Sequence, residues 1–89
     1  MNDEIIWTIV PGLHPGDVYK VAAIGDFFAV ARRRSHKWWD SFISPLCRIG
    51  DHVVPFKILE RDRRRVDTST SEVDAMERAV ELAIKEQSR

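Results

Sequence analysis

The sequence predicts an α+β fold, in which a small antiparallel sheet of three to five strands carries one C-terminal amphipathic helix packed across one face. Short β-branched and aromatic runs, separated by Gly and Pro turns, occupy about residues 4–60 and indicate strands. An apolar stripe at helical spacing occupies about residues 70–87. With 89 residues, 44% of them apolar and 31% charged, the chain is expected to form a single small domain, 1–89, around one modest core.

The first three strands are predicted from turn residues that interrupt apolar runs. The run from Ile5 to Val10 is β-branched and aromatic, and it stops at Pro11-Gly12, which predicts a first strand followed by a loop over 11–17. Two further runs, 18–24 and 27–33, flank Gly25-Asp26. A glycine at the first central position supplies the positive φ of a type II′ turn, so these two runs are predicted to form a tight hairpin.

The second arm of this hairpin changes from apolar to basic along its length. Alternation places Phe28, Val30 and Arg32 on one face of the strand. Both faces begin apolar and end basic, so the strand is expected to leave the core at about Ala31. The arginines at 32–34 would then project into solvent.

The following segments are less regular. Residues 38–44 fit either a helix or a short strand, and a strand that pairs back across 35–37 is slightly favoured. Residues 52–60 form another extended candidate, in which Pro55 cannot donate a ladder hydrogen bond. That segment is therefore expected to be an edge strand or two short pieces. Residues 61–65 are expected to be solvated.

The C-terminal helix is the clearest element by periodicity. Ser69 and Glu72 have the spacing of a capping box, with Thr70 and Ser71 as competing caps. The apolar stripe that is expected to lie on the sheet consists of Val73, Met76, Ala79, Val80, Ala83 and Ile84. The i, i+4 ion pairs expected on the outer face are Asp74 with Arg78 and Glu81 with Lys85.

Charge is unevenly distributed along the chain, although the 14 basic and 14 acidic residues balance. Residues 1–30 carry a net charge of −3, residues 31–65 carry +6, and residues 66–89 carry −3. The balanced total gives no general attraction to nucleic acid or to an anionic membrane. The basic middle could nevertheless attract an acidic partner, including the acidic helix of a second copy.

Neither an export signal nor a membrane span is expected from the sequence, and a single cysteine cannot form an internal disulfide. The acidic start and the short apolar run over 5–10 do not resemble a secretory signal, and no apolar stretch approaches the ~20 residues of a span. Cys47 is the single cysteine. These features predict a cytoplasmic protein that does not associate with membranes.

The sequence also predicts that the protein is not an enzyme. Cys47 has His52 five positions on but no third group at a catalytic spacing. The other histidines, His14 and His36, are too scattered for a metal site, and the four glycines form no phosphate-binding loop. We therefore expect no catalytic residues, cofactor, metal or small-molecule substrate.

A basic and aromatic cluster is the one candidate binding region. Arginine recognises phosphate and carboxylate groups, and an exposed tryptophan can stack on a base or anchor a protein interface. The candidates are Arg32, Arg33, Arg34, Lys37, Trp38 and Trp39, supplemented by Arg63, Arg64 and Arg65 if the sheet brings the two runs together.

Two functions suit this cluster. The first is a small non-enzymatic binding or regulatory module that acts through a protein interface, with a protein partner or a homodimer. The alternative is a nucleic-acid-binding module that uses 32–39 with 61–65. A plainer interpretation remains, in which one tryptophan belongs to the core and the arginines keep strand ends soluble.

Overall fold

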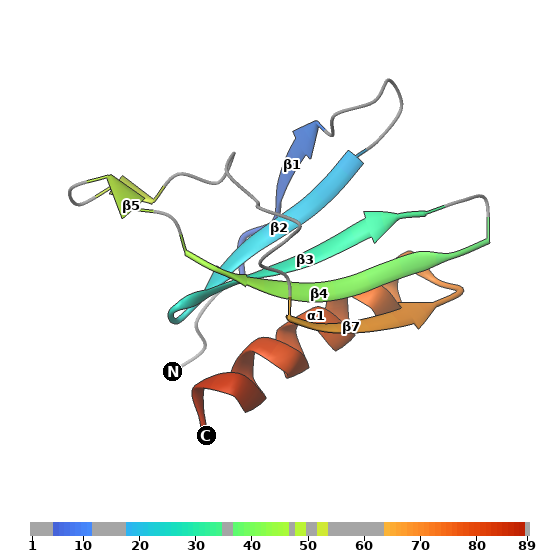
Figure 1. Cartoon of the computed structure of the whole chain (residues 1–89). Coiled ribbons are helices and arrows are strands. Elements are labelled where there is room, and N and C mark those ends of the chain that lie inside the picture. The colour runs from blue at the N-terminus through green and yellow to red at the C-terminus, as the bar shows by residue number, and fades with distance from the viewer. Residues whose placement is uncertain are drawn as a thin grey trace.

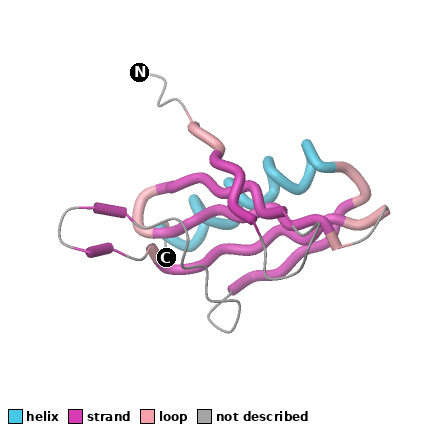
Figure 2. Tube along the Cα trace, turned by 90° about the horizontal axis from the view of Figure 1, so that it is seen from above, coloured by secondary structure: helices cyan, strands magenta, loops and turns pink. Residues whose placement is uncertain are grey.

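The computed structural model, shown in Figure 1, describes residues 5–11, 18–34, 37–46, 48–49, 52–53 and 64–88. Five strands form one antiparallel sheet in the order β1-β2-β3-β4-β7, and β5 pairs with β6 separately. The helix lies along one side of the strand layer (Figure 2). The predicted α+β fold is confirmed. The elements are β1 (Thr8–Pro11), β2 (Val18–Ile24), β3 (Phe27–Arg33), β4 (Trp39–Pro45), β5 (Arg48–Ile49), β6 (His52–Val53), β7 (Arg64–Ser69) and α1 (Glu72–Gln87).

Strand β7 is an edge strand that the sequence did not predict. Its first residues belong to the stretch expected to be solvated, and its sequence, Arg-Arg-Val-Asp-Thr-Ser, lacks the apolar alternation of a half-buried strand. It forms because it pairs with β4, with Asp67 opposite Ser41 and Ser69 opposite Trp39. Of the extended candidate over 52–60, the structure describes only β6; the remainder lies outside the described residues.

The predicted hairpin at Gly25-Asp26 is confirmed, because Ile24 lies opposite Phe27 across the turn and Gly25 has a φ of +60°. The end of α1 is fixed to this turn. The side-chain amide of Gln87 donates to the carbonyl of Ile24 at 2.9 Å and to that of Ala83 at 3.1 Å. A single glutamine therefore joins the last turn of the helix to the β2–β3 hairpin.

Gly25→Ala is expected to destabilise the fold by about 1 kcal/mol, because a left-handed residue with a Cβ is strained. The added Cβ would also meet the Gln87 side chain. Urea denaturation of Gly25→Ala, with Gln87→Ala and the double variant, measures both contributions. If the added Cβ does not clash with Gln87, the losses of unfolding free energy in the two single variants add up to the loss in the double variant. If it does clash, the double variant loses less than this sum.

Side chains are buried on both faces of the sheet. The face under α1 brings Ala29 and Ile43 against Ala79, Leu82 and Ala83 of the helix. The residues buried on the opposite face, which alternate with the first set along the strands, are Val10, Tyr19, Val21, Phe28, Val30 and Phe42. The central strands β3 and β4 are therefore apolar on both sides.

Helix α1 places three alanines and one leucine against the sheet. Ser71 is the N-cap and accepts from the backbone N–H of Asp74 at 3.4 Å, so one of the competing caps is used. The buried helix residues are Ala75, Ala79, Leu82 and Ala83. The small alanines let the helix approach β4 closely enough for the Ser41 hydroxyl to donate to the carbonyl of Ala75 at 2.7 Å.

The predicted apolar stripe is therefore wrong for two of its members, because Val73 and Ile84 are exposed. The expected i, i+4 pairs are also replaced. The Arg78 guanidinium instead contacts Asp67 of β7 and Glu81, its i+3 neighbour. Within the described part of the chain, no helix is long and apolar enough to cross a membrane.

Candidate binding surfaces

Arg32, the first of the three consecutive arginines, forms a largely buried ion pair. It lies opposite Asp40 across β3 and β4, and its Nη2 is 2.7 Å from the Oδ2 of that carboxylate. Its guanidinium carbon also lies 5.7 Å from the centroid of the Phe42 ring. The Asp40 side chain is 1% exposed and that of Arg32 is 18% exposed. The expectation that Arg32 projects into solvent is therefore wrong, because the strand continues past Ala31 and a buried carboxylate holds the arginine.

The other members of the basic run remain at the surface. Arg33, Arg34, Lys37 and Trp38 are all exposed, whereas Trp39 is half-buried at the start of β4. The backbone N–H of Arg34 donates to the carbonyl of Trp38 at 2.9 Å, which brings these two residues together. We call Arg33, Arg34, Lys37 and Trp38 the basic end.

The second basic run does not reach the basic end through its backbone. Arg64 lies opposite Ile43, which is four positions along β4 from Trp39, or about 13 Å at the rise of a strand. Arg65 follows Arg64 in β7, and Arg63 lies outside the described residues. The strand register thus separates the two runs, which would form one surface only if the sheet brought them together.

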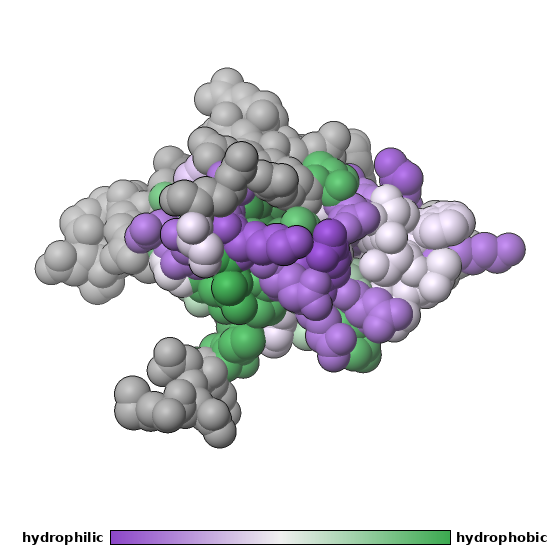
Figure 3. Space-filling view, turned by 90° about the horizontal axis from the view of Figure 1, so that it is seen from below, coloured by the Kyte–Doolittle hydropathy of each residue, from purple (hydrophilic) through white to green (hydrophobic). Residues whose placement is uncertain are grey.

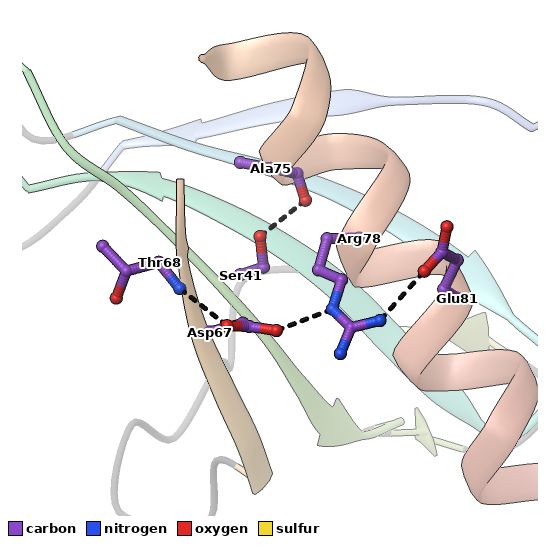
Figure 4. A network of polar contacts seen from close by, with 6 residues as sticks. All are labelled: Ser41, Asp67, Thr68, Ala75, Arg78 and Glu81. Atoms are coloured by element: carbon purple, nitrogen blue, oxygen red, sulfur yellow. Dashed lines mark hydrogen bonds and ion pairs between the residues drawn. The ribbon is translucent and has the colours of Figure 1, made fainter. Parts of the chain in front are cut away.

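A polar network joins β7 to the outer side of α1 (Figure 4). The Asp67 Oδ2 accepts from Arg78 Nε at 2.6 Å, and its Oδ1 accepts from the backbone N–H of Thr68 at 3.2 Å. Arg78 Nη1 also donates to Glu81 at 2.9 Å. The bond from Arg78, and then that from Thr68, lower the pKa of the Asp67 carboxyl below its ordinary value of 3.8. The carboxylates of Asp67 and Glu81 in turn raise the pKa of the Arg78 guanidinium.

This network is expected to make folding stability depend on acid pH. Because the pKa of Asp67 is lowered in the folded state, its contribution is complete above about pH 4 and is lost as the pH falls through the folded value. The Asp67→Asn variant should therefore be slightly less stable than wild type at neutral pH, and the difference should vanish in acid. Thermal denaturation from pH 7 to pH 2 measures it. A constant difference across this range would contradict the assignment to the Asp67 carboxylate.

An apolar groove of about 410 Å³ lies between the N-terminal segment and α1. Its walls are Ile5 and Trp7 on one side and Val73, Met76 and Val80 on the other. The groove is also lined by Glu77 and Glu81. On the helix face of the molecule, apolar surface gathers beside strongly hydrophilic surface (Figure 3).

The groove exists because the sheet does not fully cover three large apolar residues of the helix, although one of them, Val80, also packs against the core. Val73, Met76 and Val80 follow one another at intervals of three and four residues, so they share one side of α1. Ile84, four residues after Val80, extends this stripe by a turn and is exposed. Trp7 packs against the core beneath the helix, which places the N-terminal segment beside the stripe. We call Ile5, Trp7, Val73, Met76 and Val80 the apolar groove.

The residues of the apolar groove are not among the candidate binding residues that the sequence predicts. A signal for the groove was present in the sequence, because the apolar arc of the helix is wider than one sheet contact requires. This arc runs from Ala75 and Leu82 round to Val73 and Ile84.

Comparison of the chain with known protein families, characterised proteins and solved structures finds no match. Among the described residues, no group of three His, Cys, Asp or Glu side chains could hold a metal ion.

Proposed function

We propose that this domain is a non-enzymatic binding module that holds an apolar segment of a protein partner in the apolar groove. One observation carries the proposal: α1 buries three alanines and Leu82 against the sheet and leaves Val73, Met76 and Val80 lining an open groove. A helix that served only to cover the sheet would carry polar side chains on its remaining sides, whereas Val73 is exposed on the side that lines the groove. Exposed apolar surface of this kind is typical of interaction sites.

The lining of the groove also indicates what the partner segment carries. Removing one large apolar side chain from water contributes about 1.5 to 3 kcal/mol, so one or two anchors supply most of the affinity. Glu77 and Glu81 add negative charge beside the anchors. Because Arg78 already contacts Glu81, Glu77 is the main acid that a partner can approach. Lysine or arginine next to the apolar anchor would complement this charge.

A peptide selection tests this function. Random peptides are selected for binding to the wild-type domain and then counter-selected against Val73→Arg. This change places a charge in the groove at an exposed helical position, where it should not affect folding. We expect enrichment of sequences with an aromatic or aliphatic anchor beside basic residues. Methyl shifts of Met76 and Val80 on titration with the synthetic peptides should locate them in the groove.

The matched control is Val66→Arg, an identical change at an exposed position on β7 that does not line the groove. The selected peptides should bind this variant as they bind wild type. Failure to enrich any sequence that distinguishes Val73→Arg from Val66→Arg would overturn the proposed function.

Nucleic-acid binding is the second candidate, because a backbone hydrogen bond in the basic end places exposed Trp38 beside Arg34. An aromatic ring among cations is suited to stacking on the bases of a single strand. Contacts to phosphate would come from the exposed cations of the basic end, Arg33, Arg34 and Lys37. Three contacts predict that the logarithm of the association constant falls with log salt with a slope of about −2 for a single strand.

Titration of fluorescent single- and double-stranded DNA and RNA oligonucleotides, at several salt concentrations, tests this alternative. Binding with that slope, abolished in Trp38→Ala, would support it. No saturable binding at low salt would exclude it.

A further inference from the structure

The basic end of this chain has the chemistry that the apolar groove requires of a partner. We propose that the groove of one copy binds Trp38 of a second copy, so that the domain associates with itself. This inference rests on the proposed function and names the occupant of the groove.

Trp38 is suited to be the inserted anchor. Its side chain is 44% exposed, and it is the largest of the exposed apolar side chains that the structure describes. The hydrogen bond from the Arg34 N–H to the Trp38 carbonyl holds the backbone on which the indole is carried. A side chain presented on an ordered backbone loses less conformational entropy when it binds. Tryptophan and arginine are also the residues that most often dominate binding energy at protein interfaces.

The groove offers matching shape and charge. Its apolar walls, Val73, Met76 and Val80, would surround the indole, while Glu77 lies where a cation next to the indole can approach. Arg34 is such a cation: its side chain is 60% exposed, and its Nε lies 3.6 Å from Asp40, farther than the 2.7 Å contact of Arg32. Lys37, next to Trp38, adds a second positive charge.

The distribution of charge favours this pairing over an unrelated partner. The total is zero, but residues 31–65 carry +6 and residues 66–89, which contain α1, carry −3. Two copies can therefore approach with the basic end of one facing the acidic helix of the other. Such steering accelerates encounter and is weakened by salt.

Each copy carries one anchor and one groove, which are different surfaces. The contact therefore joins two different surfaces, and mutation can remove either one separately. Trp38→Ala removes the anchor and leaves the groove, whereas Val73→Arg blocks the groove and leaves the anchor. Neither variant can associate with itself, but an equimolar mixture of the two retains one complete contact per pair.

The experiment is sedimentation equilibrium or light scattering across protein concentrations, at low and high salt. Wild type should gain mass with concentration, less so at high salt. Trp38→Ala and Val73→Arg should each weaken self-association by at least about 30-fold, the fold-change of a hot-spot loss. Their mixture should form pairs of twice the monomer mass. Val66→Arg, the matched control, should associate as wild type does.

A wild-type protein that stays monomeric at every concentration would overturn the second-copy proposal, as would a mixture that fails to pair. The peptide selection separates this failure from failure of the proposed function. If the protein is monomeric but selected peptides still bind the groove, the partner is another protein. If no peptide binds the groove either, both proposals are wrong.

Discussion

Arg32→Ala is expected to lower the free energy of unfolding by about 3 to 5 kcal/mol, the cost of leaving one charge of a buried pair without its partner. The carboxylate of Asp40 is 1% exposed, and among the described residues its Oδ1 has no hydrogen-bond partner. The 2.7 Å contact with Arg32 is therefore its main stabilising interaction. Loss of the guanidinium also removes the contact with the ring of Phe42. Urea denaturation at neutral pH measures the loss.

The controls distinguish a buried pair from a basic surface. Arg34→Ala removes a more distant and exposed cation, so it should cost less than about 1 kcal/mol. Replacing both partners, Arg32→Met with Asp40→Leu, should recover most of the stability because it leaves no charge buried. If Arg32→Ala were no more costly than Arg34→Ala, Arg32 would instead be available to a partner, and the nucleic-acid alternative would gain a phosphate contact.

Ala79→Leu is expected to destabilise the domain by about 1 to 3 kcal/mol, because it inserts a large side chain where the helix touches the sheet. Ala79 is completely buried and packs in one cluster with Ala29 and Ile43. Because Ala79 is completely buried, the extra atoms are expected to push the helix away from β4. That movement would also lengthen the hydrogen bond from Ser41 to the Ala75 carbonyl. Thermal denaturation measures the loss.

The matched control is Val73→Leu, which enlarges an exposed residue on the groove side of the same helix. It should change stability by no more than about 0.5 kcal/mol. Equal costs for the two variants would contradict the orientation of α1, and with it the origin of the apolar groove.

The features predicted correctly from the sequence are those determined by local chemistry. Gly25-Asp26 defines the hairpin because a tight turn needs a positive φ there. Apolar runs on either side give β2 and β3, and the favoured strand over 38–44 appears as β4, residues 39–45. The helix is bounded by its cap and its periodicity, so α1 falls within the predicted range.

What the sequence did not predict depends on contacts between distant segments. Strand β7 has no apolar pattern of its own and becomes a strand by pairing with β4. Arg32 looks like its two neighbours in the sequence, and only the register that puts Asp40 opposite distinguishes it. The side of α1 that faces the sheet is decided by the small residues around Ala29 and Ser41, which periodicity cannot identify. The apolar groove follows from that choice.

The order of strands in the sheet also has a consequence for folding. Strands β2, β3 and β4 are consecutive and pair as neighbours, so each pairing closes a short loop. Strand β7 pairs with β4 although a long stretch of sequence separates Pro45, the end of β4, from Arg64, the start of β7. Helix α1 follows β7 directly. The local pairings among β2, β3 and β4 are expected to form quickly. The pairing of β7 with β4 is expected to be slower, because the entropy cost of closing a long loop precedes its contacts. We therefore expect the segment formed by β7 and α1 to unfold locally as one cooperative unit. Since α1 forms one wall of the apolar groove, a partner bound there would hold this unit in place and slow the exchange of its amide protons.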